Sequence, residues 1–262
     1  MKKIWKCFCA STLLMVTGIV YSPAIAEGSA LPAVYLLLFK EVINPFINPS
    51  LIPRILNDTG ITWGGNATSG NNADCSSDMG VAQDCSQGRD TTNNNDADGH
   101  AGFSFTKLDP GGVELPADAA TWSCVRDNVT KLVWEAKTDD GGIHDKDNKY
   151  KWGGSTVLGS GYGNYYTDWE SLVNGSNNQS LCGYSNWRVP TVNELTGLIN
   201  YGRHTPSIDT VYFPYTQPSY YWSSSPSSSS QNTAWWVHFL YGHSNTYDRI
   251  LEIYVRLVSS GQ

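Results

Sequence analysis

Hydrophobic and polar positions alternate over residues 233–240, near the end of the chain. One alternate set begins at Trp235 and is apolar, and the other begins at Trp236 and includes His238. A period of two predicts a β-strand with one buried face. The set that contains Trp236 leads into a run of aromatic and polar residues, so we expect that set to lie half-exposed.

A half-exposed row of aromatic and polar side chains on a strand offers flat apolar area at small entropic cost, with hydrogen-bonding groups beside it. Such a row is typical of a recognition surface. The alternative is that Trp236 packs under a loop as part of the core, as tryptophan commonly does. The residues predicted to contact a ligand are Trp236, His238, Tyr241, His243, Asn245, Tyr247 and Asp248.

Other apolar strings predict short strands between long polar loops. Residues 101–108 predict a weak strand, and residues 122–126 and 132–136 predict two strands joined by a turn. Strand-like strings return near the end of the chain, at residues 220–222 and 253–258. Residues 223–230 are so rich in serine that we expect them to lie outside the core.

Two segments carry the signature of a helix start. Thr167 is followed three residues later by Glu170, and Thr191 by Glu194. This spacing predicts a capping box, in which the two side chains bond each other's main-chain N–H groups. We expect Gly202 to end the second helix in a left-handed conformation. The prediction is an α+β fold, with two helices, small antiparallel sheets and long loops. The apolar face of the second helix consists of Val192, Leu195, Leu198 and Ile199.

The start of the chain has the pattern of an export signal. A basic beginning is followed by an apolar stretch at residues 11–20 and by the small residues Ala24 and Ala26. We expect residues 1–26 to be a signal peptide, residues 27–120 a loop-rich extension, and residues 121–262 the main domain. Export predicts the periplasm, the outer surface or the extracellular space, and the signal does not choose among them.

The charge of the chain restricts its partners. The formal net charge is −7, and no cluster of Lys and Arg is present beyond the predicted signal. Nucleic acid and anionic membrane surfaces both favour clustered basic residues, so we expect neither as a partner. Residues 31–39 are apolar but too short for the ~20 residues of a membrane-spanning helix. We therefore expect no membrane insertion once the signal is cleaved.

Four cysteines follow the predicted signal: Cys75, Cys85, Cys124 and Cys182. An even number in an exported chain predicts two disulfides, with three possible pairings. Proximity in the sequence favours Cys75 with Cys85 and Cys124 with Cys182. With all four paired, no thiol remains for catalysis or for zinc.

Asn94, Asp96 and Asp98 stand at alternate positions before Gly99, as oxygen ligands do at the start of a calcium loop. The twelfth position is Phe105 instead of the Glu that an EF-hand needs, so an EF-hand is excluded. A turn shaped by Asn and Asp side chains is favoured over a looser calcium site. The histidines have no zinc spacing and no nucleophile motif is present. We therefore expect no catalysis and no cofactor, with calcium as the alternative.

Arg126, Arg188 and Arg256 lie inside apolar strings. Because an unpaired buried charge is costly, we expect these arginines to pair with buried acids and not with a ligand. Most of the tryptophans are expected in the core. These are Trp122, Trp134, Trp152, Trp169, Trp187 and Trp222.

Ordered motifs over residues 121–258 resemble those of one bacterial family. Among them are WSCVRDNVTKLVWE at residues 122–135, GGIHDKDN at 141–148 and CGYSNWRVPTVNEL at 182–195. Further matching strings lie at residues 208–214, 221–225 and 254–258. This part of the chain resembles the C-terminal domain of the Legionella collagen-like adhesin.

The resemblance implies a C-type-lectin-like fold and a disulfide between Cys124 and Cys182. It also implies surface ligand binding, because the adhesin binds sulfated polysaccharides. The chain lacks collagen-like repeats, so multivalent adhesion is not implied. It also lacks the Glu-Pro-Asn and Trp-Asn-Asp strings with which calcium-dependent C-type lectins hold sugar, so calcium-bridged sugar binding is not implied.

A narrower resemblance is to the variable proteins of diversity-generating retroelements, which carry a C-terminal cassette of this kind. Those elements mutate template adenines, so asparagine codons change to a limited set of residues. Trp236 and Glu252 do not belong to that set, so they would be fixed in the template or mutated from other codons. The reachable positions are His238, Leu240, Tyr241, His243, Ser244, Asn245, Thr246, Tyr247, Asp248, Ile250, Leu251 and Ile253.

Together these features predict an exported, adhesin-like protein that binds a ligand without catalysis. The predicted partner is a surface polysaccharide or a protein, recognised by the C-terminal strands and loops. The alternative is a structural or assembly component of the cell envelope.

Overall fold

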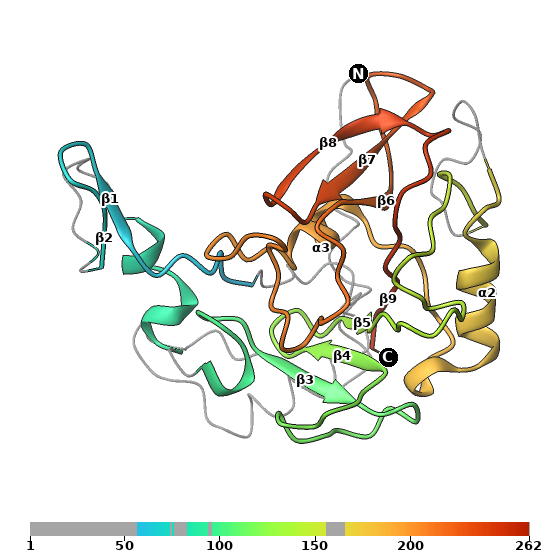
Figure 1. Ribbon diagram of the computed structural model, residues 1–262, viewed down its shortest axis with the longest axis horizontal. Helices are drawn as coiled ribbons and strands as arrows, with labels where there is room; N and C mark the ends of the chain where they lie inside the picture. Colours follow the sequence, from blue (N-terminus) through green and yellow to red (C-terminus); the bar gives the residue numbers. More distant parts are fainter. Residues whose placement is uncertain (1–56, 74, 76–82, 94–95, 156–165, 262) are drawn as a thin grey trace, which may run out of the picture. The chain divides into compact units, whose positions relative to one another are not determined.

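The computed structural model describes residues 57–73, 75, 83–93, 96–155 and 166–261, all within the unit Arg54–Gln262. These residues form three small antiparallel sheets and the helices α2 and α3 (Figure 1). The α+β prediction is confirmed. The predicted signal peptide, residues 1–26, lies outside the described residues and stays a prediction.

The elements are short, and long loops connect them. The strands are β1 (Gly64–Asn66), β2 (Gly70–Asn72), β3 (Phe105–Leu108), β4 (Cys124–Asp127), β5 (Val133–Glu135), β6 (Tyr220–Pro226), β7 (Thr233–His238), β8 (His243–Asp248) and β9 (Val258–Ser259). The helices are α2 (Glu170–Asn178) and α3 (Val192–Thr196), with single 3₁₀ turns η3 (Asp84–Ser86), η4 (Arg89–Thr91), η5 (Asp96–Asp98) and η6 (Leu181–Gly183).

The four-stranded sheet has the order β3-β4-β5-β9. The turn between β4 and β5 forms at Asp127, whose carboxylate accepts hydrogen bonds from the N–H groups of Val129 (2.8 Å) and Thr130 (3.1 Å). The two strands predicted around this turn are confirmed, as is the weak strand that becomes β3. β9 pairs with β5 at Trp134 and Val258, so the end of the chain returns to this sheet.

The three-stranded sheet has the order β6-β7-β8, with β7 in the centre (Figure 1). Its two faces pack on different core clusters. Trp222 and Trp236 belong to one cluster, and Tyr221 and Val237 belong to the other. The expectation of a single buried face in residues 233–240 is therefore wrong, because side chains from other elements cover β7 on both faces.

The serine-rich segment after Trp222 is also different from the expectation. Ser223 and Ser224 are buried within β6. The Ser223 hydroxyl donates to the carbonyl of Trp235 (2.8 Å), and the Ser224 hydroxyl donates to the carbonyl of Pro190 (3.2 Å). A buried hydroxyl with a partner costs little, so these serines fit in the core despite their polarity.

The two helix starts behave differently. At α3, the Thr191 side chain accepts from the N–H of Glu194 and the Glu194 carboxylate accepts from the N–H of Thr191, so the predicted capping box is confirmed. The helix α2 begins later than predicted, with Trp169 at the N-cap and no side-chain cap, so the box predicted at Thr167 is wrong. Trp169 is fully buried against Trp152, with ring centroids 5.7 Å apart, and this packing fixes where the helix starts.

The end of α3 also corrects the sequence interpretation. The C-cap is Gly197, and Gly202 is not left-handed. Gly202 instead allows a close approach, because a Cβ there would lie 2.1 Å from the carbonyl oxygen of Gly60. The predicted apolar face is confirmed: Leu195, Leu198 and Ile199 are buried, with Val192 packed beside them.

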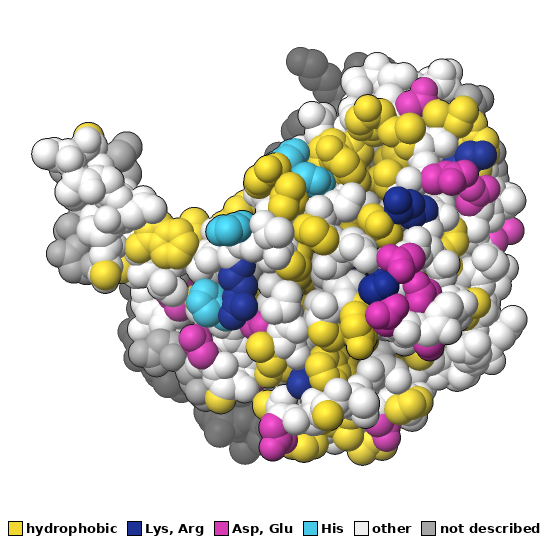
Figure 2. All heavy atoms as spheres, in the orientation of Figure 1, with side chains coloured by type: hydrophobic (Ala, Val, Ile, Leu, Met, Phe, Trp, Pro, Cys, Tyr) yellow, Lys and Arg dark blue, Asp and Glu magenta, His cyan; other side chains and the backbone are white. Residues whose placement is uncertain are grey.

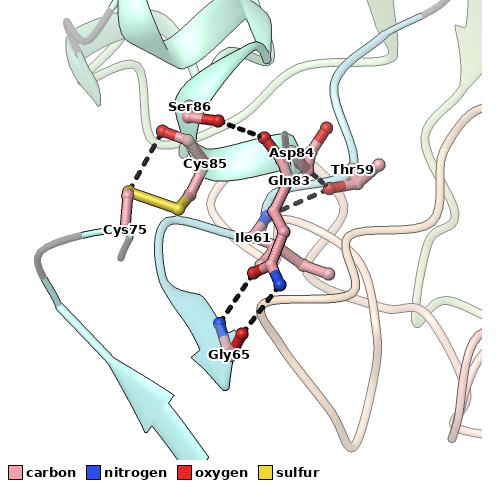
Figure 3. The surroundings of a disulfide bond; sticks show 8 residues. All are labelled: Thr59, Ile61, Gly65, Cys75, Gln83, Asp84, Cys85 and Ser86. Atoms are coloured by element: carbon pink, nitrogen blue, oxygen red, sulfur yellow. Dashed lines mark hydrogen bonds between the residues drawn. A yellow bond between two sulfur atoms is a disulfide. The ribbon is translucent and has the colours of Figure 1, made fainter. Parts of the chain in front are cut away.

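Both favoured disulfides are present. One joins Cys124 of β4 to Cys182 of η6. The other joins Cys75 to Cys85, next to the β1–β2 hairpin (Figure 3). There the Gln83 amide donates to the carbonyl of Gly65 and accepts from its N–H group, both at 2.7 Å, which ties β1 to the disulfide-bonded loop.

The three arginines in apolar strings have three kinds of partner. Arg188 forms a bidentate ion pair with Glu194, at 2.7 and 2.8 Å, so it pairs with an acid as predicted, although this acid is only partly buried. Arg126 pairs with Glu114 at 2.7 Å, but this acid is 62% exposed, so the expected buried partner is wrong. Arg256 is fully buried, and it donates to the main-chain carbonyl of Glu135 (2.6 Å) and to the hydroxyl of Thr216 (2.8 Å), not to a carboxylate.

The expectation for tryptophan is confirmed at five positions. Trp122 is the exception, because it is half-buried beneath the Lys107 ammonium group, which lies 3.7 Å from the ring centroid. The fully buried tryptophans are Trp134, Trp152, Trp169, Trp187 and Trp222.

Candidate ligand-binding face

The pairing of β6, β7 and β8 gathers aromatic side chains on one face of the sheet. In antiparallel strands, directly opposed residues point to the same side. His238 is opposed to Tyr220 on β6 and to His243 on β8, and Trp236 is opposed to Asn245. With Tyr247 two positions further along β8, these residues share one face of the sheet.

Five of the rings on this face form a continuous contact network, and the sixth, Tyr247, lines a hollow with Tyr220 and Trp236. Tyr220 stacks on His238 (4.2 Å between centroids) and meets Trp236 edge-on (4.7 Å). His238 lies 5.1 Å from His243, and Tyr241, in the β7–β8 turn, lies 6.3 Å from His243 with the two rings nearly parallel. We call this set the aromatic face: Tyr220, Trp236, His238, Tyr241, His243 and Tyr247.

The aromatic face has an exposed layer above a buried one. Tyr241, Tyr247 and Tyr220 are 69%, 50% and 38% exposed. Figure 2 shows hydrophobic and histidine side chains gathered where Figure 1 labels β7 and β8. Rigid rings on an ordered sheet present apolar area that loses little entropy on binding.

Trp236 and His238 are only 5% and 6% exposed, so the expectation that both stand half-exposed is wrong. The rings of Tyr220 and His243, from the strands on either side, lie against Trp236. The Trp236 indole N–H and the His238 Nδ1 atom are buried and have no hydrogen-bond partner among the described residues. Burial and the neighbouring His243 lower the pKa of His238, so this ring is neutral in the folded protein at pH 7.

Asp248 and Asn245 complete the predicted set. The pairing of Asp248 with Thr233 places its side chain on the sheet face opposite to Tyr247. Its carboxylate accepts from the N–H of Ile250 (3.1 Å), so Asp248 does not join the other predicted residues. Asn245 is exposed on the same face as Trp236 and accepts from the N–H of Thr246 (2.8 Å).

A hollow of about 200 Å³ opens on the aromatic face. Tyr220, Trp236 and Tyr247 contribute to it from three strands, and Leu251, Glu252 and Ile253 close it from the segment after β8. Two hydrogen bonds between Ile253 and Tyr150, at 2.8 and 3.1 Å, hold that segment in place.

Four residues of this hollow are not among the ligand-contact residues predicted from the sequence: Tyr220, Leu251, Glu252 and Ile253. For Tyr220 a signal exists, since it alternates with the buried Trp222 and is therefore on the same face as Trp222. The other three reach the hollow through the pairing of Ile253 with Tyr150, a contact between distant parts of the chain that no local pattern indicates.

The calcium alternative rested on Asn94, Asp96 and Asp98. Asn94 lies outside the described residues. The Asp96 carboxylate accepts from the N–H of Ala101 (2.8 Å), and the Asp98 carboxylate accepts from the hydroxyl of Ser104 (2.6 Å). Within the described ranges, no three His, Cys, Asp or Glu residues are grouped so that they could hold a metal ion.

The described part of the chain contains no helix with the length and apolar character needed to cross a membrane.

A family model described as the Lcl C-terminal domain matches residues 123–259, just over half of the chain. No curated protein and no solved structure matches the chain. The matched range includes α2, α3 and the whole aromatic face. The resemblance found in the sequence is confirmed: the chain belongs to the Lcl C-terminal domain family, a family of adhesin-like surface proteins.

Proposed function

We propose that this protein is an exported binding protein that recognises a surface polysaccharide with the aromatic face. The observation that carries the proposal is the group of three exposed tyrosines on one sheet, of which Tyr220 and Tyr247 line the hollow and Tyr241 lies in the β7–β8 turn. A sugar ring has apolar C–H faces and hydroxyl groups at its edge. A tyrosine offers an apolar ring and a phenolic hydroxyl, so the two surfaces match.

The support beneath these rings favours binding. Tyr220 packs on Trp236 and His238, which are buried. β8 is an edge strand that is held through main-chain pairing with β7, and nearly all of its side chains are exposed. A preorganised surface of this kind loses little conformational entropy when a ligand binds.

The charge around the aromatic face favours a neutral or cationic polysaccharide over a sulfated one. His238 is neutral at pH 7, since burial and His243 lower its pKa. Glu252 adds a carboxylate at the hollow. The net charge of the chain is −7, and like charges repel an anionic ligand. The sulfated ligands of the collagen-like adhesin are therefore not the expected ligands of this chain.

A carbohydrate array that includes neutral, amino-substituted and sulfated polysaccharides, read beside a protein array, tests the proposal. Binding to neutral or amino-substituted polysaccharides supports it. Binding to proteins alone, or to neither class, contradicts it, and the second result favours a structural role in the cell envelope.

The absence of catalysis is part of the proposal. The matched family is adhesin-like and not a known enzyme family. All four cysteines after residue 26 form disulfides, so none supplies a reactive thiol. The disulfides also agree with export, since such bonds persist in oxidising compartments. Titration of free thiols in the unfolded, unreduced protein without residues 1–26 tests this point, and a reactive Cys there would contradict it.

We also propose a C-type-lectin-like fold for residues 121–262, preceded by a loop-rich extension over residues 27–120 of which the segment Phe105–Leu108 packs on it. Two helices, small antiparallel sheets and the return of β9 to β5 support this fold. β3 belongs to the extension and pairs with β4, and the Phe105 ring lies 5.4 Å from that of Phe213. A fragment of residues 121–262 should thus be less stable than the whole chain; equal stability would contradict the extension's packing role.

Diversification by a retroelement is a further part of the proposal. The reachable positions in β8, from His243 to Asp248, have side chains that are mostly exposed, while main-chain bonds to β7 form the strand. Side chains there can change without loss of the fold. Sequencing the genomic neighbourhood tests this idea. A reverse transcriptase gene and a near-repeat of the coding segment should be present, and their absence would contradict diversification by a retroelement.

A further inference from the structure

The hollow on the aromatic face combines rings, aliphatic groups and one carboxylate. Tyr220, Trp236 and Tyr247 supply the rings, Leu251 and Ile253 the aliphatic groups, and Glu252 the carboxylate. We infer that this hollow binds a compact organic cation, a methylated ammonium group carried by the ligand. The inference rests on the proposed binding role of the aromatic face and names the chemical group that this role selects.

The rings favour a cation. The face of an aromatic ring carries a partial negative charge, which attracts a cation within about 6 Å of the ring centroid. Trp gives the strongest attraction of the natural side chains, and aromatic enclosures of this kind recognise quaternary ammonium groups. The hollow brings one Trp and two Tyr together from three different strands.

Glu252 adds a negative charge that, within the described part of the chain, is held only in a long, solvent-accessible ion pair. Its ion-pair partner among the described residues is Lys151, with 3.9 Å between Nζ and Oε1 and with both side chains accessible to water. A pair of this length at the surface contributes little. The carboxylate is thus available to a cationic ligand, and it repels an anionic one.

The aliphatic groups and the size of the hollow narrow the ligand class further. A metal ion or a primary ammonium group is strongly hydrated and would lose water against Leu251 and Ile253 without replacement bonds. A methylated ammonium group is weakly hydrated, and its methyl groups match apolar walls. The hollow measures about 200 Å³, below the roughly 300–1,000 Å³ of sites for drug-sized ligands, so it accommodates a single head group.

Isothermal titration of the purified protein with choline and with 3,3-dimethylbutan-1-ol tests the inference. The second compound has nearly the same shape and no charge. We expect choline to bind about 2- to 30-fold more tightly, the range that corresponds to cation–π attraction. Ethanolamine, which has a primary ammonium group, should bind more weakly than choline. Equal affinity for choline and its neutral analogue would overturn the inference.

Two variants identify the site. Glu252→Gln removes the charge at an exposed position, and Tyr247→Ala removes one ring; each should weaken choline binding at least fivefold. Tyr215→Ala is the matched control, because Tyr215 is an exposed tyrosine outside the hollow. Thermal unfolding of each variant verifies the fold. Unchanged choline affinity in both hollow variants would overturn the inference.

The result is separable from the proposed function. If the protein binds a polysaccharide on the array but does not discriminate choline from its neutral analogue, the aromatic face binds ligands and the cation inference alone is wrong. If it binds choline but no polysaccharide, the hollow is a cation site and the proposed polysaccharide role is wrong.

Discussion

Replacing Glu135 by Gln tests how the buried charges hold the four-stranded sheet. Glu135 is fully buried in β5. Its carboxylate accepts from the Lys137 ammonium (2.9 Å) and from the N–H of Leu257 (2.8 Å), and lies 2.7 Å from His144 Nδ1. Leu257 comes directly before β9, so one carboxylate connects β5 with the returning end of the chain. Glutamine keeps the shape and removes the charge.

The expected cost follows from the pKa of Glu135. Burial raises this pKa, but the charge of Lys137 and the hydrogen bond from His144 outweigh burial and hold it at about 2, below the ordinary 4.5. At 1.36 kcal/mol per pKa unit, the ionised carboxylate contributes about 3 kcal/mol of folding free energy. Removal of one partner from a buried pair has a similar cost, about 3–5 kcal/mol. We therefore expect a loss of about 3 kcal/mol at pH 7.

Urea denaturation at pH 7 measures this loss, with Glu114→Gln as the matched control. The exposed pair of Glu114 and Arg126 should contribute no more than about 1 kcal/mol. The pKa of Glu135 is lowered by folding, so its contribution is present above pH 4.5 and is lost as the pH falls from 4.5 towards 2. This loss should be missing in Glu135→Gln. A Glu135→Gln cost equal to that of the control would refute the reasoning.

Three further predictions concern the core, the disulfide and the pH response. Trp236→Ala should lower the free energy of unfolding by about 3–5 kcal/mol in a urea titration, because the indole is buried; a surface-like loss under 1 kcal/mol would contradict its core role. Replacing Cys124 and Cys182 by Ala should lower stability by about 4 kcal/mol, since the disulfide closes a loop of 58-residue separation; an unchanged denaturation midpoint would refute this. Because burial and His243 lower the pKa of His238, its neutral form stabilises the fold above pH 6.5, and that stability is lost as the pH falls below 6.5. His238→Gln should have a flatter melting-temperature profile between pH 7 and pH 5 than the unmodified protein, and identical profiles would count against it.

Features that depend on neighbours in the sequence could be predicted. The capping box at Thr191 and Glu194 needs only a spacing of three and a free helix end. The β4–β5 turn depends on Asp127, whose side chain bonds the next main-chain N–H groups. Cys75 and Cys85 are close enough in sequence for their pairing to be favoured.

Features that depend on contacts between distant parts of the chain could not be predicted from the sequence. The same spacing of Thr and Glu fails at Thr167, because burial of Trp169 fixes the helix start. A period of two in the sequence shows which residues of β7 share a face of the strand. It does not indicate whether other elements cover one face or both. Trp236 is buried because Tyr220 and His243 lie against it from the flanking strands.

The candidate site could likewise be predicted from the sequence only in part. Tyr241, His243, Asn245 and Tyr247 are exposed, as the polar run after His238 indicated. The hollow itself depends on Glu252 and its neighbours, which reach Trp236 only when Ile253 pairs with Tyr150. A binding surface formed by one hairpin can be predicted from the alternation of apolar and polar residues in its strands. A cavity that a later segment closes can be identified only from the three-dimensional structure.

The most direct test of polysaccharide binding by the aromatic face is the affinity of a double variant, Tyr241→Ala with Tyr247→Ala, for the tightest-binding polysaccharide of the array. Both side chains are at least half exposed, so the melting temperature should stay within about 2 °C of the unmodified protein, as for surface substitutions. The affinity should fall at least tenfold, while Tyr215→Ala should bind normally. Full affinity in the double variant, with its fold intact, would contradict a binding role for the aromatic face.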